Sequence, residues 1–111
     1  MNRTSNPKEE GMIAVTTPKF QMGRVVATPG ALEALQEAGQ SPWNFLSQHM
    51  DAKWGTVDAE DKAANDSALR DGSRILSAYR LNTGEKIWII TTAEDDHGHR
   101  ESTAIILPEE Y

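Results

Sequence analysis

The segment from Glu85 to Ala93 constrains the fold more than any other part of the 111-residue chain. Two sets of residues alternate along this segment, and both are largely apolar: Ile87, Ile89 and Thr91 on one side, and Trp88, Ile90 and Thr92 on the other. A strand with two apolar faces must be covered on both of them. The segment is therefore predicted to be a central strand of a sheet.

Strand-like segments lie on either side of it in the sequence. Arg74 to Leu81 precedes it across Asn82, Thr83 and Gly84, residue types that tolerate the positive φ of a hairpin turn. Ser102 to Leu107 follows and ends at Pro108. These patterns predict an antiparallel meander in the second half of the chain.

The first half is mainly helical in pattern. Helices are predicted over Thr28–Gly39, Ser41–Met50 and Asp58–Gly72, with Thr-Pro and Ser-Pro starts and glycine stops after the first and third. Phe20–Ala27 is strand-like because of its two adjacent valines. The fold class predicted is α+β, with two or three N-terminal helices packed on a C-terminal three- to four-stranded antiparallel sheet. Residues 1–19 are expected to be a flexible tail, and residues 20–111 a single α+β domain.

Composition excludes several classes of protein. The chain has no cysteine, which rules out disulfides and thiolate chemistry, and its net charge is −6, all of it from the second half. An acidic chain lacks the basic field that attracts nucleic acid or anionic membranes. With no membrane-length apolar run and no signal-peptide pattern, we expect a cytoplasmic protein without a cofactor and with a protein partner.

The densest group of functional side chains is the run from Glu94 to Arg100. Its two imidazoles, His97 and His99, could ligate a divalent metal if a turn at Gly98 brought both inward. A charged connection between two strands is, however, what solvation of a loop requires. The sequence therefore predicts a solvated loop and no metal site, with His97 and His99 as weak candidates.

Cations on or beside the predicted sheet form a second group: Arg74, Arg80, Lys86 and Arg100. They could form a small anion site, because Arg74 and Arg80 have the same parity on one strand. The alternative is that both arginines pair with acids near the strand ends, such as Asp71, Asp95 or Glu109.

Other features favour structural roles. The helix pair from Thr28 to Met50 has the outline of a helix-turn-helix but contains no Lys or Arg between Ala31 and Ala52. The three tryptophans Trp43, Trp54 and Trp88 could line a pocket, but they are predicted to be core anchors. His49 is predicted to be a partly buried histidine with no catalytic duty.

Several short motifs carry a family resemblance. In order they are Gly23, Ala27-Thr28-Pro29-Gly30-Ala31-Leu32, Trp54-Gly55, Ser77-Ala78-Tyr79-Arg80-Leu81, Lys86-Ile87-Trp88-Ile89-Ile90-Thr91 and Leu107-Pro108-Glu109-Glu110-Tyr111. Over residues 20–111 the chain resembles small bacterial proteins labelled "plasmid-related protein". The resemblance implies a cytoplasmic protein often carried on mobile elements, and it implies no established activity. The loop Glu94–Arg100 departs from the family pattern by being longer and richer in His.

A second similarity is to the closing strands of barnase-like ribonucleases. It rests on Ser73-Arg74-Ile75-Leu76, Trp88-Ile89-Ile90-Thr91-Thr92 and His97. It implies Arg74 as the phosphate-binding cation and His97 as the general acid, with Glu60 a possible base by spacing. The acidic net charge counts against a polyanionic substrate.

The sequence contains no phosphate loop, triad or basic patch, which favours a role other than catalysis. We expect a small accessory protein that acts through protein contacts, and the family resemblance links it to plasmid or mobile-element maintenance or defence. Glu109, Glu110 and Tyr111 are the predicted docking residues for a basic partner. The alternative is the ribonuclease that uses Glu60, Arg74 and His97.

Overall fold

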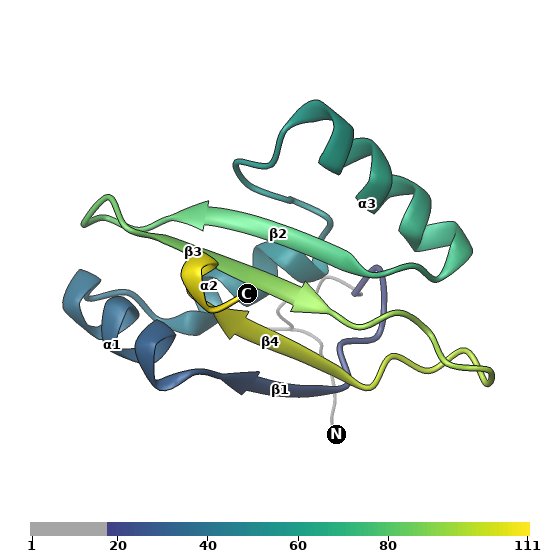
Figure 1. The fold of residues 1–111 in the computed structure, drawn as a ribbon, viewed down its shortest axis with the longest axis horizontal. Helices are drawn as coiled ribbons and strands as arrows, with labels where there is room; N and C mark the ends of the chain where they lie inside the picture. Colours follow the sequence, from purple (N-terminus) through teal and green to yellow (C-terminus); the bar gives the residue numbers. More distant parts are fainter. Residues whose placement is uncertain (1–17) are drawn as a thin grey trace, which may run out of the picture.

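The computed structural model describes residues 18–111, in which three α-helices and a four-stranded sheet form an α+β arrangement (Figure 1). The elements are β1 (Arg24–Ala27), α1 (Pro29–Ala38), α2 (Pro42–Met50), α3 (Ala59–Asp71), β2 (Ile75–Arg80), β3 (Lys86–Thr91), β4 (Ser102–Ile106) and the short 3₁₀ helix η1 (Pro108–Glu110). The tail expected over 1–19 lies almost wholly outside the described residues.

The order of the strands is β1-β4-β3-β2, so β3 is central, as the sequence predicted. Both β2 and β4 pair with β3 antiparallel, but β1 pairs with β4 in parallel, with Arg24 beside Ser102. The prediction of a purely antiparallel sheet that follows the helices was therefore wrong. Parallel neighbours need a long crossover, and everything between β1 and β4 provides it.

The predicted helix boundaries are confirmed by their caps. Thr28 and Ser41 accept hydrogen bonds from Ala31 N and Trp43 N at 3.1 Å each, and Asp58 accepts one from Asp61 N at 2.7 Å. Gly39 adopts φ +67°, which ends α1 in the left-handed conformation that glycine favours. Within residues 18–111, no helix has the length and apolarity needed to cross a membrane.

The main core lies between the helix pair α1/α2 and one face of the sheet. Leu35, Phe45 and Leu46 from the helices pack there against Ile87 and Ile89 of the central strand. These are alternate residues of β3, so they share a face. A second cluster, centred on Trp54, Ala68 and Ile75, lies where α3 meets the sheet.

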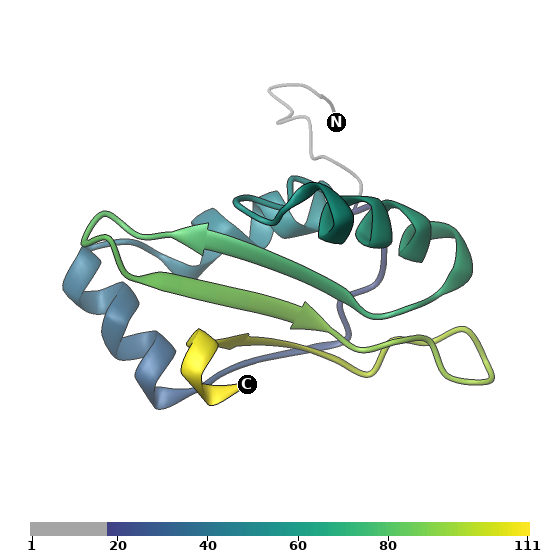
Figure 2. The same cartoon turned by 45° about the horizontal axis from the view of Figure 1, so that its top comes forward.

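The outer edge of β2 is covered by two neighbours. Ala78 N donates to Trp54 O at 3.0 Å, and Thr56 N donates to Ala78 O at 2.7 Å. From α3, which runs alongside β2 (Figure 2), the Asn65 amide bonds both the N–H and the C=O of Leu76. A Cβ at Gly55 would lie 1.9 Å from Ala78 O, so this close approach requires glycine.

Candidate functional site

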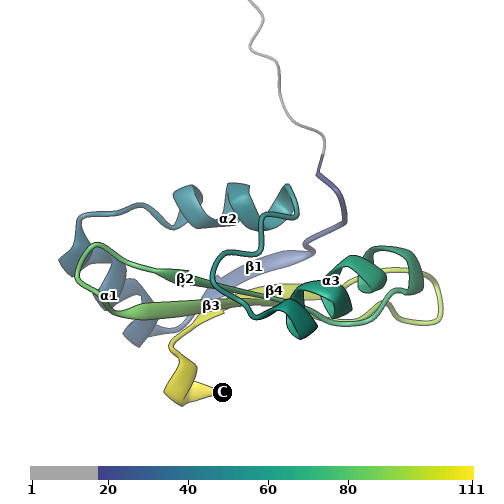
Figure 3. The same cartoon turned by 90° about the horizontal axis from the view of Figure 1, so that it is seen from above.

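The two faces of the sheet differ in what covers them. Seen from above, α2 lies on one side of the sheet and η1 on the other (Figure 3). On the side of η1, the sheet carries an apolar strip that η1 and Tyr111 cover only in part, with α3 along its β2 edge. Its residues are Val26, Leu76, Trp88, Ile90 and Ala104, of which Val26 is 40% exposed and the others are partly exposed. We call this surface the open face.

Four exposed cations surround the strip: Arg24, Arg74, Arg80 and Lys86. Strand register places Arg24 on the open face through its pairing with Ser102, and Arg80 beside Lys86. None of the four strands contains an acidic residue. The parity that the sequence predicted for Arg74 and Arg80 is confirmed.

These cations have no acidic partner in the described chain. Ion pairs within residues 18–111 are limited to Lys53–Asp51 at 3.5 Å and Lys62–Asp66 at 3.1 Å. The alternative in which Arg74 and Arg80 pair with acids near the strand ends is therefore wrong. Their charge faces solvent in a protein whose net charge is −6.

Arg74, Trp88 and Tyr111 form an aromatic–cation group, which we call the anchor cluster. Arg74 Nη1 donates to Tyr111 Oη at 3.0 Å, and its guanidinium carbon lies 5.8 Å from the centre of that ring. The rings of Trp88 and Tyr111 meet edge-on at 5.5 Å. With Asp61 and Asn65 of α3, among others, they line a cavity of about 250 Å³. Arg, Trp and Tyr are the residues enriched at binding hot spots.

The predicted docking residues at the end of the chain divide between two roles. Glu110 accepts hydrogen bonds from Thr28 Oγ1 at 2.7 Å and Leu107 N at 2.8 Å. These bonds, from the Leu107 N–H first and Thr28 second, lower the pKa of Glu110. Glu110 therefore holds η1 against the start of α1, whereas Tyr111 belongs to the anchor cluster. Glu109 is exposed.

The loop with two histidines is organised by its own aspartate. Asp95 Oδ1 accepts from His97 N at 2.8 Å and His99 N at 2.9 Å. These bonds, His99 first, lower the pKa of Asp95. The carboxylate is thereby committed to the loop backbone, and residues 18–111 contain no group of three or more side chains suited to hold a metal ion.

Arg100 does not join the other cations. It is 4% exposed, and its guanidinium donates to the carbonyl oxygens of Ser73, Thr92 and Ala68 at 2.7, 2.9 and 3.0 Å. These bonds link the last turn of α3 to the segment before β2 and to the loop after β3. Arg100 is therefore a structural residue and not part of an anion site.

His49 belongs to a buried polar chain under α2. Its ring nitrogens contact the hydroxyls of Ser77 and, at 2.8 Å, Thr91, and Thr91 contacts Thr103 at 2.7 Å. Thr103 donates its only hydroxyl proton to Met22 O at 2.7 Å. Thr103 must therefore accept from Thr91, and Thr91 from His49 Nε2–H, so Nδ1 accepts from Ser77.

This chain of bonds requires a neutral imidazole. Burial, and after it the positive charge of Arg100, lower the pKa of His49 to about 3. Ser77 donating to a histidine is the arrangement of an activated nucleophile. However, both residues are 0% exposed, and the rings of Phe20 and Trp54 lie 5.1 and 6.0 Å from His49. The group is sealed from solvent, and His49 is more deeply buried than the partial burial predicted from the sequence.

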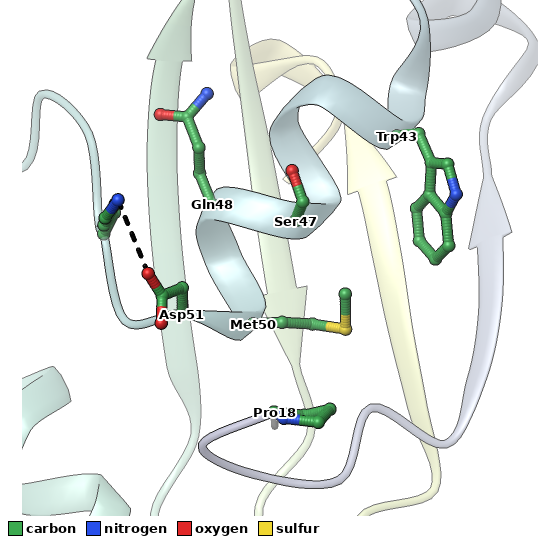
Figure 4. A pocket seen from close by; sticks show the side chains of 7 residues that line it. Pro18, Trp43, Ser47, Gln48, Met50 and Asp51 are labelled. Carbon is green, nitrogen blue, oxygen red and sulfur yellow. Dashed lines mark ion pairs between the residues drawn. The ribbon is translucent and has the colours of Figure 1, made fainter. Parts of the chain in front are cut away.

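The three tryptophans have three different environments. Trp54 is a core anchor, as predicted, and its indole N–H donates to Asp66 at 2.9 Å, which lowers the pKa of Asp66. Trp88 is half-buried on the open face. Trp43 is 60% exposed and, with Pro18 and Met50, lines a pocket of about 420 Å³ on the outer side of α2 (Figure 4). The prediction that Trp43 is a core residue was wrong, because α2 turns it outward.

The residues of the ribonuclease alternative do not line one cavity. Arg74 belongs to the anchor cluster, Glu60 is an exposed residue in the first turn of α3, and His97 is exposed in the loop after β3. Of the three, only Arg74 lines the cavity of about 250 Å³.

Three of the four cations, Arg74, Arg80 and Lys86, belong to the group predicted from the sequence. The contribution of Arg24 was not predicted, because it depends on the parallel pairing of β1. The contact of Trp88 with Tyr111 was not predicted either. No family model, curated protein or solved structure matches the chain. Its function must therefore be inferred from geometry.

Proposed function

We propose that the protein is a non-enzymatic interaction module whose open face binds an acidic segment of a partner protein. One observation carries this proposal: an exposed apolar strip is bordered by four cations without a carboxylate partner in residues 18–111, on a protein of net charge −6. Interfaces combine an apolar centre with a charged rim, and their potentials are complementary. The family resemblance would place such a partner among the proteins of mobile elements.

Charge argues against two other occupants of the open face, a second copy of the chain and the segment before Pro18. A second copy would face the same four cations with its own, because a twofold interface uses the same patch twice. The segment before Pro18 carries two basic and two acidic side chains, so it offers no negative excess. An acidic segment of another protein can pair with the four cations while its apolar residues cover the strip.

A site-specific photocrosslinking experiment tests the proposal. A photoreactive residue replaces Ile90 on the open face or, as the matched control, Leu32, which is 47% exposed on α1. In bacterial cells, we expect one stoichiometric protein partner from position 90, with an acidic segment at the crosslink, and none from position 32.

Charge reversal sharpens the result. Arg80→Glu/Lys86→Glu should abolish the crosslink, whereas Lys19→Glu/Lys53→Glu, an equal charge change elsewhere, should retain it. A partner captured equally by both variants would overturn the proposal. Crosslinks to RNA, or RNA cleavage lost in Arg74→Ala and His97→Ala, would replace it with the ribonuclease alternative.

A further inference from the structure

The first constraint on the partner is the shape of the open face. Four strands place the outer two about 14 Å apart. One α-helix of about 10–12 Å diameter matches the part of this width that lies beside η1 and Tyr111, which contact β3 and Trp88 on the same face. A partner strand cannot add to β2, because the outward N–H and C=O groups of Leu76 and Ala78 are already bonded by Asn65 and by the segment Trp54–Thr56. The covered edge favours a helix lying on the face over a strand added beside β2.

The second constraint is the spacing of charge. Arg74 and Arg80 border the two ends of β2, and their Cα atoms are therefore about 20 Å apart. Aliphatic side chains lie between them, with Leu76 and Ile90 side by side in the strand register. A nucleic acid carries a phosphate at every nucleotide and would place several over this apolar stretch. A helix covers the same distance in about 13 residues, with apolar residues at its centre and acids near its ends.

The third constraint is the anchor cluster. Only Nη1 of Arg74 is used in its bond to Tyr111, which leaves donors of the guanidinium for an incoming anion. Asp61 lines the same cavity, and its carboxylate would repel a doubly charged phosphate more than a singly charged carboxylate. The rings of Trp88 and Tyr111 exclude water around the contact, as at hot spots.

We infer that the partner segment is an acidic amphipathic helix that places one Asp or Glu on Arg74, an apolar stripe over Leu76 and Ile90, and a second acid near Arg80 and Lys86. This inference rests on the proposed function and specifies its partner. The apolar contact supplies affinity, and the two acids fix the direction of the helix on the sheet.

Titration with synthetic peptides tests it. An 18-residue helical peptide with Glu near both ends and a central Leu/Ile stripe is compared with three others: one with Lys in place of Glu, one with the stripe scrambled, and one of the same composition held extended by prolines. Binding to the full chain is followed by calorimetry, and the site by amide NMR shifts. We expect the first peptide alone to bind and to shift the resonances of β2 and β3.

Variants locate the anchor. Arg74→Ala should weaken binding about tenfold, and Arg74→Lys should restore only part of it because lysine lacks the planar fork. Lys53→Ala, on the other side of the sheet, is the control and should have no effect. Equal binding to wild type and Arg74→Ala would overturn the inference.

The remaining outcomes separate the inference from the proposed function. If the extended acidic peptide binds the open face and the helical peptide does not, the inference of a helical partner is wrong. The proposed interaction module then still stands. If a single-stranded RNA probe shifts the open face while no acidic peptide does, both are overturned.

Discussion

The two faces of the sheet are built from alternate residues of the same strands, yet they treat polar groups in opposite ways. The covered face takes His49, Ser77 and Thr91 out of water and bonds each of them. The open face leaves its cations in solvent without a carboxylate partner in the described chain. The lowered pKa of His49 thus lies where no ligand can reach. The proposed function therefore rests on cations that have no carboxylate partner within residues 18–111, and not on a perturbed pKa.

The largest expected effect comes from two neighbouring isoleucines. Ile89 is 0% exposed on the covered face, whereas Ile90 is only partly buried on the open face. Ile89→Ala should lower the free energy of unfolding by about 3 kcal/mol, since it leaves a cavity in a packed core. Ile90→Ala should lower it by about 1 kcal/mol or less, because little buried area is lost. Urea denaturation measures the free energy of unfolding of both variants. Equal losses would contradict the difference between the covered and the open face.

An intermediate effect is expected from the neutral His49. Its pKa is 6.5 when unfolded and about 3 when folded, so between these values the unfolded state binds the extra proton. The stabilising contribution is complete above pH 6.5 and is lost as pH falls toward 3. At pH 5.0 the loss is about 2 kcal/mol relative to pH 7.

The difference between wild type and His49→Gln isolates this dependence. The variant should be less stable at pH 7 but should lose less stability between pH 6.5 and 5.0, since all other titrating groups are shared. Parallel pH profiles in urea denaturation would show that His49 is not held neutral by the fold.

The smallest expected effect concerns η1, the 3₁₀ helix of this chain on the side of the open face. Thr28→Ala removes the cap of α1 and the bond to Glu110, and should cost about 1 kcal/mol. Ser41→Ala, which removes only the cap of α2, is the matched control. Both should lower stability similarly, but only Thr28→Ala should release η1 and change the NMR resonances of Trp88 and Tyr111. Unchanged resonances would show that the bond from Thr28 to Glu110 does not position the anchor cluster.

Local patterns predicted most of the elements. The caps Thr28, Ser41 and Asp58, the hairpin turn before β3 and the central place of β3 all follow from a few adjacent residues, and all are confirmed. Covering of one sheet face by the helix pair α1/α2 is confirmed as well.

Contacts between residues that are distant in the sequence could not be predicted from local patterns. The parallel pairing of β1 leaves no mark on the residues of β1, which are also suited to an antiparallel edge. The sequence also does not distinguish an arginine that is buried and bonded to carbonyl oxygens, as Arg100 is, from one that is exposed. Trp43 shows the same limit, because a large aromatic residue on a helix predicts a core face and the actual direction depends on what packs nearby.

The parallel pairing of Arg24–Ala27 with Ser102–Ile106 has a consequence for biosynthesis. The first strand of the described sheet, β1, must wait for its last strand, β4, because its only pairing in that sheet is with β4. The hairpin of β2 and β3 can form earlier from local contacts, whereas closing the sheet spans nearly the whole described chain. During translation, the valines of β1 therefore stay without their partner strand until β4 has been synthesised.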